Sequence, residues 1–230
     1  MQAKEIKDKL KSLIEKASMI DPQLAKRLNE INRWLKYTRP GSLTAKPLVL
    51  AFLLEIITDS TIWLIIQSLP TAAARQAKFD QMTANERYWY GYLFPKWINS
   101  TDAKFYIWKK KMMAGEFNQL DDDIIKSLAQ TIVRREGTFW QRYIADLSMA
   151  TDLIVSNHQH KPLCIQVTSV SEELHGKKYE KWQNALQMWE IERGLFLSYN
   201  PGEIGFIHQL VNVVLYNSDH LSEGKYVNFS

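Results

Sequence analysis

The chain has 230 residues, 46% of them hydrophobic and 23% charged, with a net charge of +4. This length and composition support a sizeable core in one large domain or two small ones. The single cysteine, Cys164, excludes an internal disulfide framework and is typical of a reducing cytoplasm. A charged, amphipathic N-terminus excludes a secretory signal, so we expect a cytoplasmic protein.

Two amphipathic helices are predicted at the N-terminus. Apolar residues recur at helical spacing over residues 3–20 and again from Pro22 to about Tyr37. Asp21 precedes Pro22, which is the order of a helix cap followed by proline at the first helical position. The stretch Arg39-Pro40-Gly41-Ser42 ends the second helix.

The next segment, Pro47 to Leu69, is apolar nearly all round and is the only candidate for a membrane span. Glu55 and Asp59 lie near its middle, where each charge would be costly in lipid. We therefore expect a buried core helix and no membrane association.

Three shorter helices are predicted between residues 71 and 113. Thr83 and Glu86 form a capping box at the start of the second, which is interrupted at Pro95. The third combines aromatic rings with four lysines that are candidates for binding phosphates: Lys104, Lys109, Lys110 and Lys111. Alternatively, the rings belong to the core, which helical spacing favours, and the lysines form a solvated face.

Charge is distributed unevenly along the chain. Residues 1–120 carry 19 basic and 11 acidic side chains, whereas residues 121–230 carry 10 and 14. We therefore predict a basic, all-helical region over residues 1–118 and an α/β domain over residues 119–230. The basic region would face a polyanion or would simply be a lysine-rich solvated surface.

The second half alternates between helical and strand patterns. Helices are expected at 121–135, 139–148 and 177–192, strands at 151–155, 162–169 and 193–199, and an edge strand at 226–229. The apolar run within 204–216 fits a strand or a helix equally well, and residues 200–203 form a turn. No internal repeat is present.

Two of these strands form a hairpin around a polar turn. Asp152 lies at the start of the first strand and Gln166 near the end of the second. In an antiparallel pair these two positions are neighbours, so a carboxylate and an amide oxygen face the same small space. His158 and His160, in the turn, are more typical of surface residues than of metal ligands.

This hairpin resembles the core of the PD-(D/E)XK nuclease superfamily. That core has an Asp on one strand, a Glu or Gln followed two residues later by Lys on the next, and then a helix and another strand. Here Asp152 and Gln166 match, whereas Thr168 stands where the family has its lysine. The resemblance implies a small mixed sheet flanked by helices, and it covers about residues 121–201.

The resemblance also implies a divalent metal such as Mg²⁺, which prefers oxygen ligands. Asp152, Gln166 and the carbonyl of Val167 would be its ligands, and Glu136, Gln141 or Asp146 could add to them. Lys177, Lys178 and Lys181 lie on the following helix, where the lysine has migrated in some members of the superfamily. We take Asp152, Gln166, Thr168, Lys178 and Lys181 as the candidate catalytic set.

The expected function is a metal-dependent DNA endonuclease. The alternative is a catalytically inactive nuclease-fold module that binds DNA or a protein partner, which the threonine at position 168 favours. Many nucleases of this type act as dimers, so a homodimer is consistent with either function.

Overall fold

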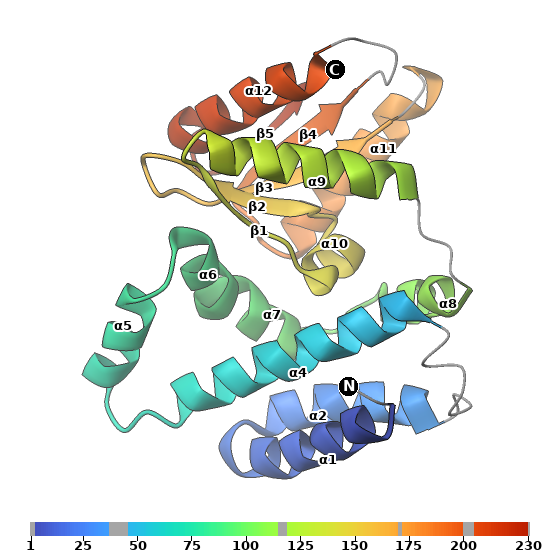
Figure 1. The fold of residues 1–230 in the computed structure, drawn as a ribbon, viewed down its shortest axis with the longest axis vertical. Coiled ribbons are helices and arrows are strands. Elements are labelled where there is room, and N and C mark those ends of the chain that lie inside the picture. The colour runs from blue at the N-terminus through green and yellow to red at the C-terminus, as the bar shows by residue number, and fades with distance from the viewer. Residues whose placement is uncertain (1–2, 37–45, 115–118, 170–171, 200–204, 230) are drawn as a thin grey trace. The chain divides into compact units, whose positions relative to one another are not determined.

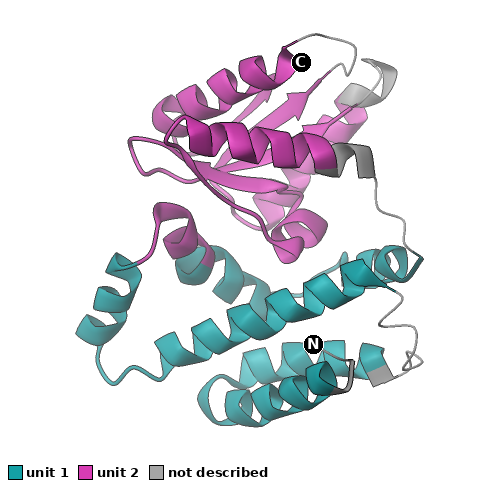
Figure 2. Cartoon of the chain, viewed as in Figure 1, with its two compact units in different colours: residues 1–81, 90–117 teal, residues 82–89, 118–230 magenta. Residues whose placement is uncertain are grey.

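The computed structural model describes residues 3–36, 46–114, 119–169, 172–199 and 205–229. The predicted break at 39–42 and the predicted turn at 200–203 lie outside these residues. The protein is of mixed α/β class and contains two compact units (Figures 1 and 2). The helical unit comprises residues 1–81 and 90–117, and the sheet unit comprises residues 82–89 and 118–230.

Six α-helices and one π-helical turn belong wholly or mostly to the described part of the helical unit. They are α1 (Ala3–Ile20), α2 (Pro22–Lys36), α4 (Pro47–Gln67), α5 (Ala72–Asp80), η1 (Trp89–Leu93), α7 (Phe94–Asn99) and α8 (Phe105–Ala114). The side chain of Asp21 caps α2 by accepting hydrogen bonds from the amides of Gln23 and Leu24. Its other oxygen accepts from the indole of Trp63 on α4, at 2.7 Å, so the cap also ties α2 to α4.

Helix α4 has the composition of a membrane span and the burial of a core helix. Among the described residues it alone is long and apolar enough to cross a bilayer, and 56% of its most apolar window is buried. Asp59 near its middle is fully buried and accepts a hydrogen bond from the hydroxyl of Tyr90, at 2.7 Å. A buried carboxylate with such a partner fits the expectation of a core helix.

Aromatic side chains fill much of the helical unit. Phe52, Tyr90, Phe94 and Trp97 are all less than 3% exposed. Of the rings in the third predicted helix, Trp108 is buried, as helical spacing favoured, whereas Tyr106 is 59% exposed. Pro95 does not end the helical path here. The turn η1 leads directly into α7, whose first turn contains the proline, where a missing amide hydrogen costs nothing.

The sheet unit contains one five-stranded mixed sheet in the order β1-β2-β3-β4-β5. The strands are β1 (Thr138–Trp140), β2 (Leu153–Ser156), β3 (Leu163–Thr168), β4 (Arg193–Ser198) and β5 (Lys225–Phe229). The first three strands are antiparallel, and the pairs β3–β4 and β4–β5 are parallel. Strand β5 is therefore an edge strand, as predicted.

Helices α9 (Gln119–Arg134) and α12 (Phe206–His220) share one apolar core with the sheet (Figure 1). Alternate residues of the central strands, including Leu163, Ile165 and Val167, belong to this core. The intervening residues therefore point to the other face. There α11 (Glu172–Met188) packs against β4, with Trp182 and Leu186 directly over Gly194.

Two short helices complete the sheet unit. Helix α6 (Ala84–Tyr88) starts with the predicted capping box of Thr83 and Glu86 and packs against β1 and β2. Helix α10 (Tyr143–Met149) lies between β1 and β2 in the chain. The prediction of a helix over 139–148 was therefore wrong for Phe139 and Trp140, which form the end of β1 and pair with β2.

Candidate active site

Asp152 immediately precedes β2 and is only 5% exposed. Its backbone amide donates to the carbonyl oxygen of Ile165, at 2.8 Å, which extends the ladder between β2 and β3 by one step. In this register Leu153 pairs with Ile165, so Gln166 lies opposite Asp152. The hairpin thus places the two predicted residues together because their positions in the chain match an antiparallel register.

The side chains of Asp152 and Gln166 are in direct contact. The amide nitrogen of Gln166 donates to the Oδ2 atom of Asp152 at 2.7 Å. The backbone amide of Val167 donates to the same oxygen, also at 2.7 Å. Two donors on one oxygen fix the orientation of the carboxylate within the site.

Thr168 ends β3 next to this pair and is 7% exposed. Lys178, on α11, donates from its Nζ atom to the Thr168 hydroxyl at 3.1 Å. Lys178 lies one helical turn before Trp182, whose indole packs against β4, and this spacing directs both side chains toward the sheet. A lysine ammonium group therefore lies beside Thr168, the position at which the resemblance seen in the sequence led us to expect a lysine.

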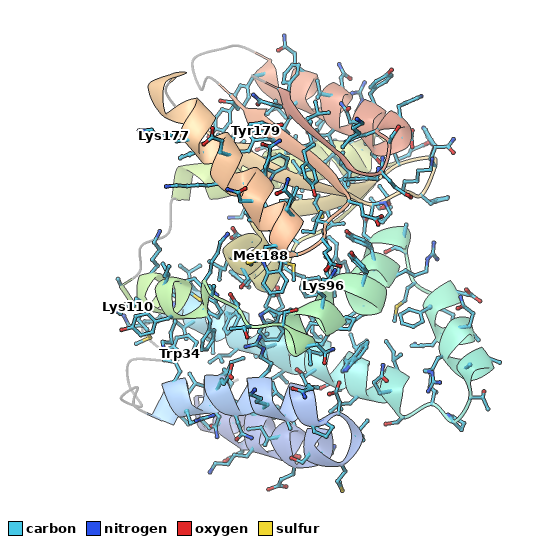
Figure 3. The ribbon with its side chains drawn as sticks, turned by 180° about the vertical axis from the view of Figure 1, so that it is seen from behind. Trp34, Lys96, Lys110, Lys177, Tyr179 and Met188 are labelled. Atoms are coloured by element: carbon cyan, nitrogen blue, oxygen red, sulfur yellow. The ribbon has the colours of Figure 1, made fainter. Side chains whose placement is uncertain are left out.

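The other predicted charged residues are placed differently. Lys177 and Lys181 are exposed on α11, as Lys178 is, and what distinguishes Lys178 is its hydrogen bond to Thr168. Figure 3 labels Lys177 on that helix. Glu136 is exposed in the turn before β1, and β1 starts opposite Ser156, at the far end of β2 from Asp152. Gln141 is exposed as well, so only Asp146 of the three suggested additional groups acts on Asp152.

Asp146 lies in the first turn of α10 and faces the same site. Burial raises the pKa of Asp152 well above its ordinary value of 3.8, and the charge of Asp146 raises it further. A hydrogen bond to Asp146 acts in the same direction, while the donors Val167 and Gln166 oppose it. The two acidic groups thus interact closely, and a hydrogen bond between them requires a proton on one of the two carboxyl groups.

The ligand atoms that this site offers are of the chemical type that a hard divalent cation such as Mg²⁺ prefers. It offers the carboxylates of Asp152 and Asp146 and the carbonyl oxygen of Val167. The amide nitrogen of Gln166 faces Asp152 and lies 3.5 Å from the Val167 carbonyl oxygen, so Gln166 would offer its side-chain oxygen only with the amide turned over. Within the described ranges no group of three or more His, Cys, Asp or Glu side chains is gathered for a metal. A cation here would therefore retain several water molecules, as Mg²⁺ usually does.

The remaining candidates make no hydrogen bond with Asp152 or Gln166 among the described residues. Cys164 is buried in β3, and burial raises the pKa of its thiol to about 12, so it is a packing residue. His158 and His160 are exposed in the turn between β2 and β3. Four lysines belong to the helical unit, at or just before α8: Lys104, Lys109, Lys110 and Lys111.

One group of buried polar contacts had no signal in the sequence. Arg193, at the start of β4, donates to the carbonyl oxygens of Leu221, Pro162, Asn217 and Ser218, at 2.6 to 3.1 Å. A lone arginine before an apolar run indicates nothing by itself, because its partners are 24 to 31 residues away in the chain.

No protein-family model, curated protein sequence or solved structure matches this chain.

Proposed function

We propose that the protein is a metal-dependent DNA endonuclease with a restriction-endonuclease-like core. The observation that carries the proposal is the juxtaposition of Asp152, Gln166 and Lys178 at one end of the central strands. The hairpin, the helix α11 and the parallel strand β4 follow in the order that the PD-(D/E)XK resemblance implies.

Lys178 is the residue we assign to the role of the family's lysine. Its ammonium group reaches the Thr168 hydroxyl from α11, so the positive charge lies at the expected place although it comes from another element. A charge held there would stabilise negative charge that develops on a phosphate during hydrolysis. Thr168 positions the ammonium group and carries no charge itself.

Asp152, Asp146, Gln166 and the Val167 carbonyl would hold the cation. When bound, Mg²⁺ would polarise the phosphodiester and lower the pKa of a water molecule. The chain's own contribution is to orient Asp152 through two hydrogen bonds and to keep its carboxylate out of bulk water. DNA is the proposed partner and the cytoplasm the proposed location, in keeping with a buried, unreactive thiol.

Cleavage of supercoiled plasmid with Mg²⁺ or Mn²⁺ tests the proposal. We expect Asp152→Ala to abolish nicking while DNA binding persists. Lys178→Ala should lower the nicking rate by about 100-fold, which is the usual effect of removing one group that stabilises developing charge. Lys181→Ala is the matched control, because it removes the same charge from an exposed position of the same helix.

Two results would contradict the proposal. One is equal nicking by wild-type protein and Asp152→Ala, which would place the activity elsewhere or in a contaminant. The other is a loss of nicking in Lys181→Ala as large as that in Lys178→Ala, since Lys178 alone of the two contacts Thr168.

A catalytically inactive nuclease-fold module is the second candidate function. The hydrogen bonds of Asp152 favour it, because one carboxylate oxygen already accepts from Gln166 and Val167. An inactive module would bind DNA, or a protein partner, without nicking any substrate under either metal. Salt-sensitive DNA binding without cleavage would identify the DNA-binding form.

A further inference from the structure

A cleft in the helical unit combines aromatic rings with cations. Its volume is about 500 Å³, and its lining includes Trp34, Phe105, Arg33 and Lys109. That volume falls within the range of pockets that bind small organic molecules. All of these residues belong to the helical unit, so the cleft is separate from the Asp152 site.

The rings of Trp34 and Phe105 are each half-buried and are supported from behind. Both meet the buried Trp108 edge-on, with ring centroids 6.2 and 4.9 Å from it, at interplanar angles of 86° and 84°. The indole of Trp108 lies 3.5 Å from the carboxylate of Asp102, which also accepts from the indole of Trp97. The two rings of the cleft are therefore held by a packed scaffold.

The acidic residues of the cleft are engaged by neighbouring donors. Glu30 forms a salt bridge with Arg27 at 2.9 Å, and Arg27 also donates to the carbonyl of Trp97. Asp102 is 7% exposed and accepts hydrogen bonds from Trp97 and from the amide of Lys104. The charge that the cleft presents to solvent is therefore that of Arg33 and Lys109.

Helical spacing adds further cations beside the cleft. Lys109 lies one turn after Phe105, with its Nζ atom 5.4 Å from the ring centroid. Lys110 lies one turn after Tyr106, with its Nζ atom 4.4 Å from the centroid of that ring. Figure 3 shows Trp34 and Lys110 on the same side of the helical unit. Two rings in the first turn of α8 are thus each followed, one turn later, by an ammonium group close to the ring.

We propose that this cleft binds single-stranded nucleic acid, with a base stacked on Trp34 or Phe105 and its phosphates held by Arg33 and Lys109. Stacking requires an unpaired base, because the faces of paired bases are covered by their neighbours in a duplex. Cations beside the rings neutralise the phosphates on either side of the stacked base. The choice of nucleic acid as the partner rests on the proposed function. What is added is that the helical unit recognises an unpaired segment of that nucleic acid.

Fluorescence anisotropy of the full chain with labelled dT12, U12 and a duplex of the same length tests this inference. EDTA in the buffer prevents cleavage, so binding is measured independently of catalysis. We expect the single strands to bind at least about tenfold more tightly than the duplex, since only they expose bases for stacking. Comparison of dT12 with U12 shows whether DNA or RNA is preferred.

Matched variants locate the site. Trp34→Leu keeps apolar volume against Phe52 and Trp108 while removing the aromatic face, and Lys109→Ala removes a cation from the cleft. Each should weaken binding of the preferred strand by about tenfold. Tyr216→Leu and Lys16→Ala, at exposed positions that do not line the cleft, should leave binding unchanged.

The outcomes separate this inference from the nuclease proposal. Unchanged binding in Trp34→Leu and Lys109→Ala would overturn the cleft as a site, whatever the plasmid assay shows. Displacement of the strand by an equal charge concentration of polyglutamate would overturn it as well, because a stacking site discriminates against a polyanion without bases. Asp152→Ala should bind the strand as wild type does, even if it no longer nicks plasmid.

Discussion

The two ends of the central strands each bury a charged side chain, and they do so in opposite ways. At the amino end of β4, Arg193 donates to four backbone carbonyl oxygens. At the other end, Asp152 receives two hydrogen bonds on one oxygen and faces Asp146, which repels it. The arginine is compensated by backbone carbonyl oxygens, whereas the two acids share a hydrogen bond that requires a proton on one of them. Under the proposed function, a cation would take the place of that proton.

This difference distinguishes the structural charge of Arg193 from the charge of Asp152, which we propose to be functional. Arg193 joins the loop before β3 to the end of α12, and burial lowers its pKa while Glu223 and Asp219 oppose that effect. Burial and Asp146 raise the pKa of Asp152. Strongly perturbed acids are enriched at functional sites, and here the perturbation coincides with the predicted pair of Asp152 and Gln166.

Arg193→Met should have the largest effect on stability. It leaves four carbonyl oxygens without this donor, one of them buried and three partly buried, and each hydrogen bond to a charged group contributes about 1.5–3 kcal/mol. Urea denaturation measures the loss. Lys225→Met is the control, because it removes the same charge from an exposed position of β5. Equal stability of the two variants would show that the Arg193 network does not hold this end of the sheet together.

Gly194→Ala should have the second largest effect. A Cβ atom at this position would lie 2.3 Å from Leu186 and 2.8 Å from Trp182, so α11 would have to move away from β4. Overpacking of this kind costs about 1–3 kcal/mol. Because Lys178 is carried on α11, plasmid nicking should fall together with stability.

The control for this substitution is a glycine of α11. Gly176 has no atom within 4 Å of the place where a Cβ would stand. Gly176→Ala should therefore stabilise the protein by up to about 1 kcal/mol through helix propensity. Destabilisation by both substitutions would contradict the account of close packing at Gly194.

Asp146→Asn should change how stability depends on pH in metal-free protein. The raised pKa of Asp152 means that its stabilising contribution is complete at low pH and is lost as the pH rises through that pKa. Removing the charge of Asp146 should lower the pKa of Asp152 and flatten this fall. Each pKa unit by which Asp152 moves back toward its ordinary value should raise the free energy of unfolding at higher pH by about 1.4 kcal/mol.

Urea denaturation in EDTA, from pH 5 to pH 8, measures this effect. Parallel pH profiles for wild type and Asp146→Asn would show that the two acids do not interact. The same substitution should weaken metal-dependent nicking, because it removes one of two carboxylates from the cation site.

Lys178→Ala should have the smallest effect on stability. The side chain makes a single hydrogen bond from an exposed residue, so its loss should change the free energy of unfolding by less than about 0.5 kcal/mol. The expected loss of nicking would then be catalytic in origin. A loss of stability as large as that of Gly194→Ala would show instead that Lys178 is structural.

Local signals allowed parts of the fold and site to be predicted. The capping box joins Thr83 and Glu86, which are three positions apart in the chain. The pairing of Asp152 with Gln166 follows from the register of a short hairpin. Strand β1 was missed because it has only three residues, too few to show the alternation of apolar and polar residues that indicates a strand. The apolar run in 204–216 had no clear period, and it forms part of helix α12.

Contacts between distant segments could not be predicted. Lys177, Lys178 and Lys181 were equivalent in the sequence, and the packing of Trp182 over Gly194 is what directs Lys178 to Thr168. The cleft of Trp34 and Phe105 likewise depends on α2 and α8 meeting at Trp108.

Binding of Mn²⁺, measured by the loss of the free-ion signal in electron paramagnetic resonance, tests the central claim most directly. We expect the wild-type protein to bind Mn²⁺ and Asp152→Asn, which keeps the shape of the side chain, not to bind it. Arg193→Lys should retain binding, because Arg193 lies at the other end of the strands. Absence of binding in wild type, or binding that survives Asp152→Asn, would contradict the assignment of Asp152 as a cation ligand.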